Sequence, residues 1–378
     1  MPCRLSLVTE TFPPEVNGVA MTLNRLSRQL VDRGVTLQVI HPRTRSAYQW
    51  GLKGNWETMT VAGLPIPGYP EAQVGLPRRS ALRQAWQQFN PQVVHVATEG
   101  VLGRTASGLA REMDIRLITS FHTNFHEYAR HYHVPWMKKI VLAYLRGLHS
   151  RAEATLVPDP DLIRDLSGMG FKKCEYFGRG VDGDLFHPAR RSVALRESWG
   201  ATPNDPVVLH VSRVAAEKNM RLVLDRFVEL KNNGQPRLQC VVVGDGPERK
   251  SLERRYPEAR FVGMKFDVEL AEHYASADLF AFASETETFG NVVLEAMASG
   301  CTVLTYDYAA GRQLIDSGRN GVLARFGDKE DFRTQMSVRL ADLPGCREMG
   351  QRARQRALEF PWARVVDQYV TTLKRVMA

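Results

Sequence analysis

The feature that most constrains this chain is a regular alternation of short, β-rich apolar runs with amphipathic segments of helix length. The first half contains the apolar runs RLSLVTE, TLQVIHP, PQVVHVA and IRLITSFHT, and helix-length segments such as MTLNRLSRQLVDRG lie between them. Runs of this length and composition indicate strands, and the longer segments indicate helices. Because the two kinds alternate, we predict an α/β fold in which helices cover a parallel sheet.

The same pattern starts again in the second half, with the runs PVVLHVSRV, LQCVVVGDG, DLFAFAS and CTVLTYD. Pro188 and the charged stretch ARRSVALRESWG separate the halves and resemble a hinge. A chain of 378 residues exceeds the size of a single core. We therefore predict two doubly wound, Rossmann-like domains, residues 1–187 and 188–360, and a terminal helix, 361–378, that crosses back to the first. Ligands collect at the carboxyl ends of such strands, so the domains are expected to face each other across a cleft.

Composition and charge narrow the function classes. Hydrophobic residues make up 44% and charged residues 24%, as in soluble enzymes. No run reaches about 18 apolar residues and the N-terminal run is too short for a secretory signal, so a cytoplasmic protein is expected. The five cysteines lack a C-x-x-C pair and are interpreted as reduced packing residues.

The net charge of +9 is uneven, since residues 1–150 hold 17 Lys and Arg against 9 Asp and Glu, and residues 151–378 hold 33 against 32. A basic first half is typical of a protein that binds nucleic acid, an anionic membrane or a phosphorylated ligand. Zinc-finger spacing, RNP-like motifs and basic helices are missing from the sequence, which disfavours nucleic acid.

The most informative string is SETETFGNVVLEAMASG, in which Glu287 and Glu295 stand eight residues apart. Its beginning is predicted to be a loop and its end a helix, so Glu287 leans toward a ligand while Glu295 lies in the first turns. Backbone amides at Phe289, Gly290 and Asn291 are expected at the helix start, where they bind hydroxyl or phosphate oxygens. The alternative is an acidic helix terminus stabilised by its dipole.

This string resembles the Glu-x7-Glu signature of glycosyltransferase family four, a retaining family of the GT-B fold, and the resemblance covers nearly the whole chain. It implies that Glu287 and the following amides hold the transferred sugar, and that Glu295 binds the nucleotide ribose. It also implies retention of the anomeric configuration and an α-linked product. No side chain stands out as a base, so the departing phosphate oxygen is expected to take the acceptor proton while Glu287 steadies an oxocarbenium-like transition state.

A diphosphate needs cations, and HVSRVAAEKN places Arg213 and Lys218 after the first strand of the second domain. By resemblance they match the family's diphosphate-binding pair; alone, they could be a solvated basic turn. The turn VVVGDGPERKSL contains Gly244 and resembles the family's G-x-G-P turn. Its third glycine position is Arg249, so a dinucleotide fingerprint is disfavoured.

In the first half, Gly18 lies between a strand and a helix, where the backbone can approach a ligand closely. The family often has two glycines here, whereas this chain has Asn17-Gly18-Val19.

By resemblance, His122 of ITSFHTNFHEYARHYHVP contacts the donor sugar. His122 and His126 have zinc-helix spacing, but the Glu of H-E-x-x-H is missing. The D-x-D-like Asp159-Pro160-Asp161 is interpreted as a helix cap. No metal or other cofactor is predicted.

The acceptor side is predicted from the segment VPWMKKIVLAYLRGLHS. It places apolar and basic side chains as an interfacial helix does: Trp136, Met137, Ile140, Val141, Tyr144 and Leu145 near one side, with Lys138, Lys139 and Arg146 beside them. A core-facing helix is the alternative. The strings FHTNFHEYARHY and GRGVDGDLFHP, the second with Arg179 and Asp182, are most similar to the lipid mannosyltransferase and sulfoquinovosyl transferase subgroup.

The sequence therefore predicts a metal-independent, retaining hexosyltransferase that moves mannose or glucose from a nucleotide sugar to a lipid on the cytoplasmic membrane face. A soluble sugar or polysaccharide acceptor is the alternative, because it requires the same donor motifs. A phosphorolytic enzyme would need a pyridoxal-binding lysine near the C-terminal region. A non-enzymatic binding module would predict a degraded donor site, whereas Arg213, Lys218, Glu287 and Glu295 are all present.

Overall fold

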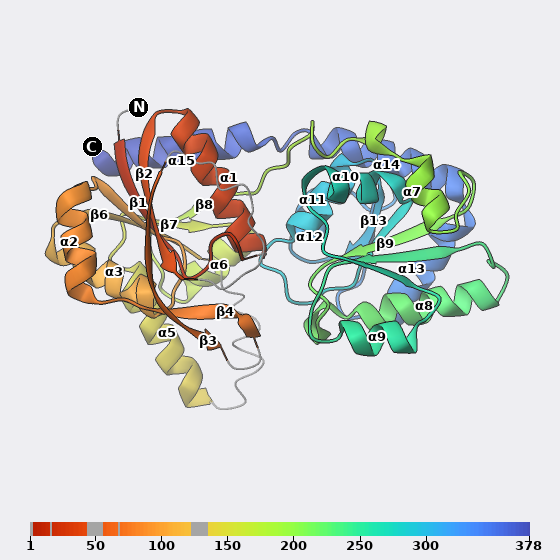
Figure 1. Cartoon of the computed structure of the whole chain (residues 1–378), viewed down its shortest axis with the longest axis horizontal. Helices are drawn as coiled ribbons and strands as arrows, with labels where there is room; N and C mark the ends of the chain where they lie inside the picture. The colour runs from red at the N-terminus through yellow and green to blue at the C-terminus, as the bar shows by residue number, and fades with distance from the viewer. Residues whose placement is uncertain (1–2, 16, 44–55, 67–68, 122–134) are drawn as a thin grey trace. The chain divides into compact units, whose positions relative to one another are not determined.

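The computed structural model describes residues 3–15, 17–43, 56–66, 69–121 and 135–378 (Figure 1). The chain divides into two compact units, one formed by Met1–Arg179 with Ala363–Ala378 and the other by Gly180–Trp362. The sequence placed the boundary after residue 187. Residues 180–187 instead belong to the second unit, because Val181 and Phe186 are buried in its core and the Val181 amide donates to the Phe360 carbonyl at 2.9 Å.

The first unit is a sheet of strand order β4-β3-β2-β1-β5-β6-β7-β8, parallel except for the antiparallel β3–β4 pair. The strands are β1 (Cys3–Val8), β2 (Val35–Pro42), β3 (Glu57–Ile66), β4 (Tyr69–Leu76), β5 (Val93–Val96), β6 (Arg116–Ser120), β7 (Ala154–Val157) and β8 (Cys174–Tyr176). The helices are α1 (Gly18–Asp32), α2 (Arg79–Phe89), α3 (Val101–Glu112), α5 (Pro135–His149), α6 (Pro160–Gly168) and α15 (Trp362–Met377). The alternation of strands and helices seen in the sequence thus produces the expected covered sheet.

The last helix, α15, packs against the first unit although it follows the second unit in sequence. Its Tyr369 is fully buried, and the hydroxyl lies 2.9 Å from Nδ1 of His95 on β5. Nε2 of His95 lies 2.7 Å from the hydroxyl of Ser120 at the end of β6. At the surface, the Asp367 carboxylate accepts a hydrogen bond from the Arg33 guanidinium at 3.1 Å. A buried polar chain therefore connects α15 to the middle of the sheet.

The second unit is a parallel sheet of order β11-β10-β9-β12-β13-β14. Its strands are β9 (Val207–Val211), β10 (Gln239–Val243), β11 (Arg260–Gly263), β12 (Leu279–Phe282), β13 (Thr302–Tyr306) and β14 (Val322–Ala324). Its helices are η1 (Pro188–Arg190), α7 (Val193–Ser198), η2 (Ala216–Lys218), α8 (Met220–Asn232), α9 (Arg249–Arg255), α10 (Asp267–Ser276), α11 (Asn291–Ala298), α12 (Ala310–Leu314), α13 (Lys329–Ala341) and α14 (Leu343–Ala357).

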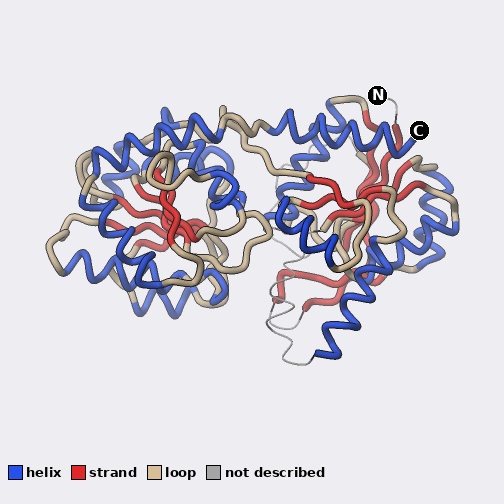
Figure 2. Tube along the Cα trace, turned by 180° about the vertical axis from the view of Figure 1, so that it is seen from behind, coloured by secondary structure: helices blue, strands red, loops and turns tan. Residues whose placement is uncertain are grey.

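Two core clusters lie on opposite faces of this sheet, with helices covering both (Figure 2). Val207 and Leu209 of β9 belong to one cluster and Val208 to the other, as the alternation of side chains along a strand requires. The strand order reverses beside β9, whose neighbours are β10 and β12. Such a switch point is where doubly wound sheets bind ligands, so the loops after β9 and β12 are the first places to examine.

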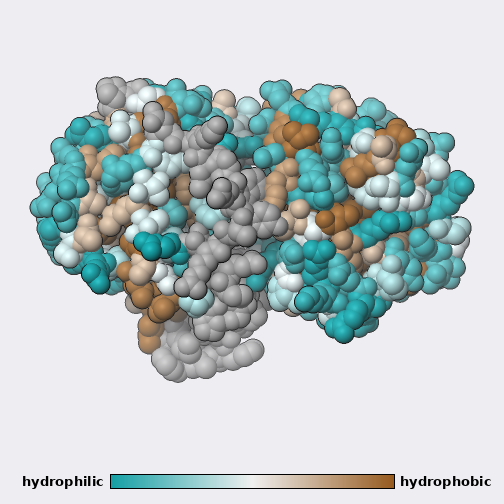
Figure 3. Space-filling model, viewed as in Figure 1, coloured by the Kyte–Doolittle hydropathy of each residue, from teal (hydrophilic) through white to brown (hydrophobic). Residues whose placement is uncertain are grey.

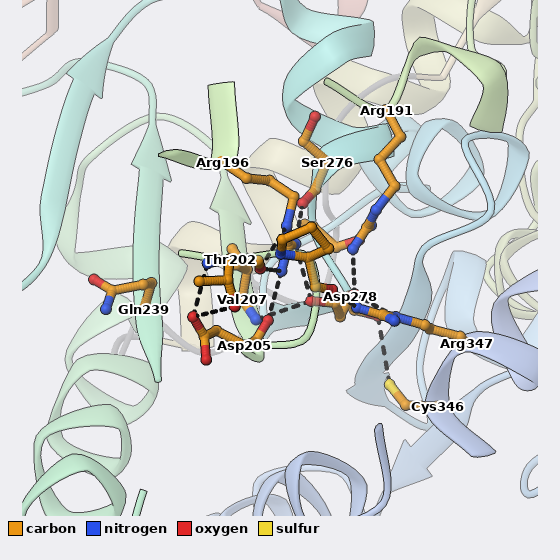
Figure 4. Close-up of polar contacts among 12 residues, drawn as sticks. Arg191, Arg196, Thr202, Asp205, Val207, Gln239, Ser276, Asp278, Cys346 and Arg347 are labelled. Atoms are coloured by element: carbon orange, nitrogen blue, oxygen red, sulfur yellow. Dashed lines mark hydrogen bonds and ion pairs between the residues drawn. The ribbon is translucent and has the colours of Figure 1, made fainter. Parts of the chain in front are cut away.

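The opposite, amino-terminal edge of the same sheet is held by a buried carboxylate, Asp278, which directly precedes β12 (Figure 4). Oδ1 accepts from Arg191 at 2.8 Å and from Arg347 at 3.0 Å, while Oδ2 accepts from Arg196 at 3.1 Å and from the Val207 amide at 3.0 Å. Arg196 lies on α7 and Arg347 on α14. One carboxylate thus ties two helices and the segment after η1 to the sheet.

Two fully buried histidines make the fold sensitive to acid. Burial lowers the pKa of His95 to about 3 and that of His210 to about 4. An unfolded chain protonates these rings below about pH 6.5, so between there and about pH 4 it binds more protons than the folded chain. We expect the free energy of unfolding to fall across that window by up to about 1.4 kcal/mol per pH unit for each ring. Urea unfolding at several pH values measures this, and a pH dependence unchanged in His95→Gln and His210→Gln would contradict it.

Two further expectations concern the whole chain. All five cysteines are free, and all except the half-buried Cys174 are buried, as predicted for packing residues. Within the part of the chain that the structure describes, no helix has the length and apolar character required to cross a membrane.

Candidate active site

Two of the predicted catalytic residues meet at the switch point of the second sheet. Lys218 ends η2, after β9, and Glu287 lies in the loop after β12. Nζ of Lys218 is 2.5 Å from Oε1 of Glu287, and less than a fifth of either side chain is exposed. The fold therefore brings together residues that are 69 positions apart in the sequence.

Neighbouring hydroxyl groups fix Glu287 in this position. The buried Ser284 donates to Oε1 of Glu287 at 2.8 Å, and Tyr308 donates to its backbone carbonyl at 2.7 Å. Sequence reasoning did not identify these two residues as part of the site. A run of polar residues separates Ala283 from Glu287 and was a usable signal for Ser284. Tyr308 lies beyond the next strand, and only the fold brings it to Glu287.

Arg213, the second predicted phosphate cation, lies beside the same strand end. Its guanidinium is 3.6 Å from the Glu217 carboxylate, and Ser212 donates to its backbone carbonyl at 2.9 Å. Gly244 follows β10 with a φ of 138°, and a Cβ there would lie 1.9 Å from the Ser212 carbonyl oxygen. Glycine is thus required for the turn after β10 to pack against the chain that carries Arg213.

The loop and helix expected around Glu287 are confirmed. Gly290 has a φ of 98°, a left-handed conformation that suits glycine, and α11 begins at the next residue, Asn291. Phe289 is buried, and its carbonyl accepts from the Ala310 amide at 2.8 Å. The amino end of α11, with its positive dipole end, therefore follows Glu287 directly, as an oxyanion site requires.

Glu295 lies on α11, between the buried Leu294 and Ala296. Its Oε2 accepts a hydrogen bond from the hydroxyl of Tyr274, on α10, at 3.2 Å. Tyr274 is fully buried, and burial raises its pKa well above the ordinary value, so the hydroxyl stays a donor. Sequence reasoning missed Tyr274, because a tyrosine within AEHYASADLF is typical of a helix packing against a core.

The predicted ligand-binding residues of the first unit are only partly described. Gly18 begins α1, and the side chain of Asn17 caps this helix by accepting from the amides of Val19 and Ala20 at 3.1 and 2.9 Å. Asn17, directly before Gly18, thus binds two amides at the helix start. His122 and His126, together with His131 and His133, lie outside the described residues.

The predicted interfacial helix, α5, is core-facing in its second half. Leu145 is buried, and Val141 and Tyr144 are half-buried against a core cluster that includes Phe121. Only its beginning fits the expectation, since Lys139 is exposed and Ile140 is 59% exposed. Among the described residues of the expected apolar side, Val141, Tyr144 and Leu145 therefore pack toward the core, whereas Ile140 does not. The side chains of Trp136 and Lys138 lie outside the described part of the chain.

Exposed apolar side chains nevertheless occur on the first unit, and brown atoms are visible at its lower left in Figure 3. We call Leu64, Leu76, Val101 and Ile140 the exposed apolar residues of the first unit. The Tyr144 hydroxyl donates to the Glu99 carbonyl at 2.8 Å, which holds α5 beside the start of α3. The Glu10 carboxylate accepts hydrogen bonds from the amides of Gly75 and Leu102, at 2.5 and 2.8 Å. These bonds hold the end of β4 beside the start of α3.

Arg179 and Asp182 stabilise their own backbone. Arg179 is buried, donates to the carbonyls of Phe177 and Gly178 at 3.2 and 3.3 Å, and has its pKa lowered to about 10 by burial. The Asp182 carboxylate accepts from the amides of Asp184 and Leu185 at 3.2 and 3.0 Å. An additional contact of either residue with the acceptor stays a prediction.

One of the two metal motifs considered in the sequence, that of His122 and His126, lies outside the described residues, and the other is Asp159-Pro160-Asp161. Within the described residues, no three His, Cys, Asp or Glu side chains are grouped closely enough to hold a metal ion. Asp159 caps α6, as predicted, by accepting from the Asp161 amide at 2.8 Å.

Comparison with known proteins agrees with this architecture. Residues 16–185 match the model described as Glycosyltransferase Family 4, and residues 193–356 match that of Glycosyl transferases group 1. A GDP-mannose-dependent alpha-mannosyltransferase of Corynebacterium glutamicum is 33% identical over 88% of this chain and 78% of its own length. The sulfoquinovosyl transferase SQD2 of Arabidopsis thaliana is 30% identical over 96% of this chain and 71% of its own.

A more distant relative and a solved structure extend this comparison. An alpha-monoglucosyldiacylglycerol synthase of Streptococcus pneumoniae is 26% identical over 85% of this chain and 75% of its own length. The structure of a sucrose-phosphate synthase from Thermosynechococcus elongatus superimposes with a TM-score of 0.81, at 17% identity and over 99% of both chains. The two Rossmann-like units therefore form the GT-B fold predicted from the sequence.

Proposed function

Because the chain belongs to glycosyltransferase family four, we propose that it transfers a hexose, of the mannose or glucose type, from a nucleotide diphosphate sugar to a lipid acceptor. The product is an α-glycoside formed with retention. The Lys218–Glu287 pair carries this proposal, since it places a cation and a carboxylate 2.5 Å apart at the sheet's switch point.

In this proposal the second unit binds the donor. Lys218 and Arg213 bind the diphosphate, and the amides of Phe289, Gly290 and Asn291 add the positive end of α11. Glu287 accepts hydrogen bonds from the hydroxyl groups of the sugar, and Glu295 accepts them from those of the ribose. Gly244 lets the backbone approach the nucleotide. Gly18 and His122 are the proposed donor contacts of the first unit.

The reaction breaks the bond between the anomeric carbon and the β-phosphate oxygen and forms the bond to the acceptor oxygen on the same face. The acceptor proton passes to the departing phosphate oxygen. Negative charge grows on that phosphate as the bond breaks, and Lys218 and Arg213 stabilise it where it develops. Glu287 stabilises the positive charge that develops on the sugar ring. We propose that these cations make a divalent metal unnecessary.

Charge and surface both support a lipid acceptor. The first unit contains 25 Lys and Arg against 15 Asp and Glu, a net charge of +10, and the second contains 25 against 26. On α5 the exposed Lys139 is followed by Ile140, one of the exposed apolar residues of the first unit. Basic and apolar side chains together are typical of proteins that bind an anionic membrane face. The streptococcal relative is named for a diacylglycerol product.

The donor and the acceptor class are tested together by nucleotide release. GDP-mannose, UDP-glucose, UDP-galactose and UDP-sulfoquinovose are supplied without added metal, with and without vesicles of anionic phospholipid that contain diacylglycerol. We expect one donor to raise the melting temperature and to release its nucleotide only when vesicles are present. Stabilisation without any effect of vesicles would favour a soluble sugar acceptor, and failure of every donor to stabilise the protein would contradict the donor site.

The membrane contribution is tested by removing charge at the start of α5. Lys138→Ala with Lys139→Ala is expected to weaken the affinity for anionic vesicles, measured by sedimentation, about thirtyfold at low salt. Each basic residue near such a surface contributes about 1 kcal/mol, and a loss of about 2 kcal/mol corresponds to that factor. Donor hydrolysis in solution should be unchanged. Lys172→Ala with Lys173→Ala, the same charge change just before β8, is the control and should bind vesicles as the wild type does. Equal weakening by both double variants would show that only net charge matters.

A further inference from the structure

The carboxylate of Glu295 is held by a tyrosine from another helix. The Tyr274 hydroxyl reaches Oε2 of Glu295 at 3.2 Å from α10, which precedes β12, whereas Glu295 lies on α11, which follows it. The two helices thus share a polar contact beside a buried apolar core, since Tyr274 belongs to the same core cluster as Leu294 and Ala296.

Aromatic contacts fix the tyrosine ring itself. Its centroid is 5.8 Å from that of Phe186 and 5.7 Å from that of Phe280, both in edge-to-face geometry. A ring packed in this way cannot change rotamer without opening the core. The hydroxyl is therefore a donor in a fixed position, and the carboxylate that accepts from it is restricted in orientation.

We propose that Tyr274 is a positioning residue of the donor site, which orients the Glu295 carboxylate so that it can accept from both hydroxyl groups of the nucleotide ribose. This inference rests on the proposed function. A carboxylate offers about four acceptor positions, so the bond from Tyr274 leaves capacity for a ribose diol. By orienting the carboxylate in advance, the tyrosine lowers the entropic cost of binding the nucleotide.

Tyr274→Phe tests this proposal, because it removes one oxygen atom and keeps the ring. The ribose lies away from the reacting bond and is held equally before and during the reaction, so loss of its contact raises KM and spares kcat. We expect KM for the donor to rise about tenfold, the equivalent of one net hydrogen bond, with kcat within about twofold of the wild type.

Tyr256→Phe is the matched control. The Tyr256 hydroxyl likewise donates to a carboxylate, that of Asp225, at 2.6 Å, and Tyr256 is buried in the same unit. This variant loses the same kind of bond outside the proposed site, so it should keep the wild-type KM even where its melting temperature falls. An equal rise of KM in both variants would mean that Tyr274 acts only through stability, and would overturn the proposal.

Calorimetric titration then tests whether the contact of Glu295 is with the ribose. Binding of GDP is compared with that of 2′,3′-dideoxy-GDP, and the comparison is repeated with UDP and 2′,3′-dideoxy-UDP. The wild type is expected to bind the dideoxy form more weakly, and Tyr274→Phe to lose most of that difference. In a variant that already carries Glu295→Ala, adding Tyr274→Phe should not change nucleotide affinity further, since the two residues act as one unit. If the wild type discriminates and Tyr274→Phe discriminates equally, the positioning role is wrong. If the wild type binds both forms equally, the ribose role of Glu295 fails, and the present inference fails with it.

Discussion

Lys218→Ala and Glu287→Ala are each expected to lower kcat by about a thousandfold, at the upper end of what removal of one transition-state charge contact costs. Lys218 faces the phosphate on which negative charge grows, and Glu287 faces the sugar on which positive charge grows. Both contacts strengthen as the bond breaks, so kcat should fall more than KM rises. Steady-state kinetics with the donor identified by thermal shift measures this.

The ion pair between these residues also predicts how the variants combine. Nζ of Lys218 and Oε1 of Glu287 are 2.5 Å apart, so each single change leaves the other charge without its partner. The double variant should therefore be about as inactive as either single one, instead of a millionfold slower. Lys231→Ala is the control, because this lysine donates to the Leu238 carbonyl and lies over the ring of Phe227, outside the proposed site. Near wild-type turnover in either single variant would refute the site.

Asp278→Asn is expected to lower the free energy of unfolding by about 3–5 kcal/mol, as removal of one partner from a buried ion pair does. The substitution leaves the guanidinium groups of Arg191, Arg196 and Arg347 around a neutral amide, and Arg196 is itself fully buried. Urea unfolding of the whole chain, followed by its intrinsic tryptophan fluorescence, to which the buried Trp199 of the second unit contributes, measures this free energy.

The matching control is Asp316→Asn. Asp316 pairs with Arg319 at 3.7 Å, but two thirds or more of each side chain is exposed, so the change should cost less than about 1 kcal/mol. A loss for Asp278→Asn as small as that would mean that water already reaches the Asp278 cluster.

The sequence predicted those parts of the site that depend on local order along the chain. A strand followed by a short polar turn is readable from composition, so the positions of Arg213, Lys218 and Gly244 after their strands followed at once. Glu287 in a loop and Glu295 on a helix were also readable, because glycine at position 290 and the apolar run after it mark the helix start. The family motif added roles that spacing alone does not supply.

What the sequence did not reveal depends on contacts between distant elements. Tyr274 resembles any core tyrosine until α10 is placed beside α11, and Asp278 resembles a strand-end residue until three arginines surround it. The apolar side expected on α5 illustrates the opposite error. Periodicity shows that one face of a helix is apolar but not what covers it, and here Leu145 and its neighbours face the core. The boundary near Pro188 was misplaced because proline marks a turn, whereas the division between the units follows from packing.

The position of α15 has a consequence for biosynthesis. The first unit contains residues from both ends of the chain, and Tyr369 reaches His95 only when the last helix is in place. On the ribosome, the second unit emerges as one uninterrupted stretch and can acquire its core while translation continues. Residues 1–179, translated before the second unit, must wait for α15 before their sheet is covered. Termination of translation before α15 therefore damages the unit whose other residues were made before the second unit.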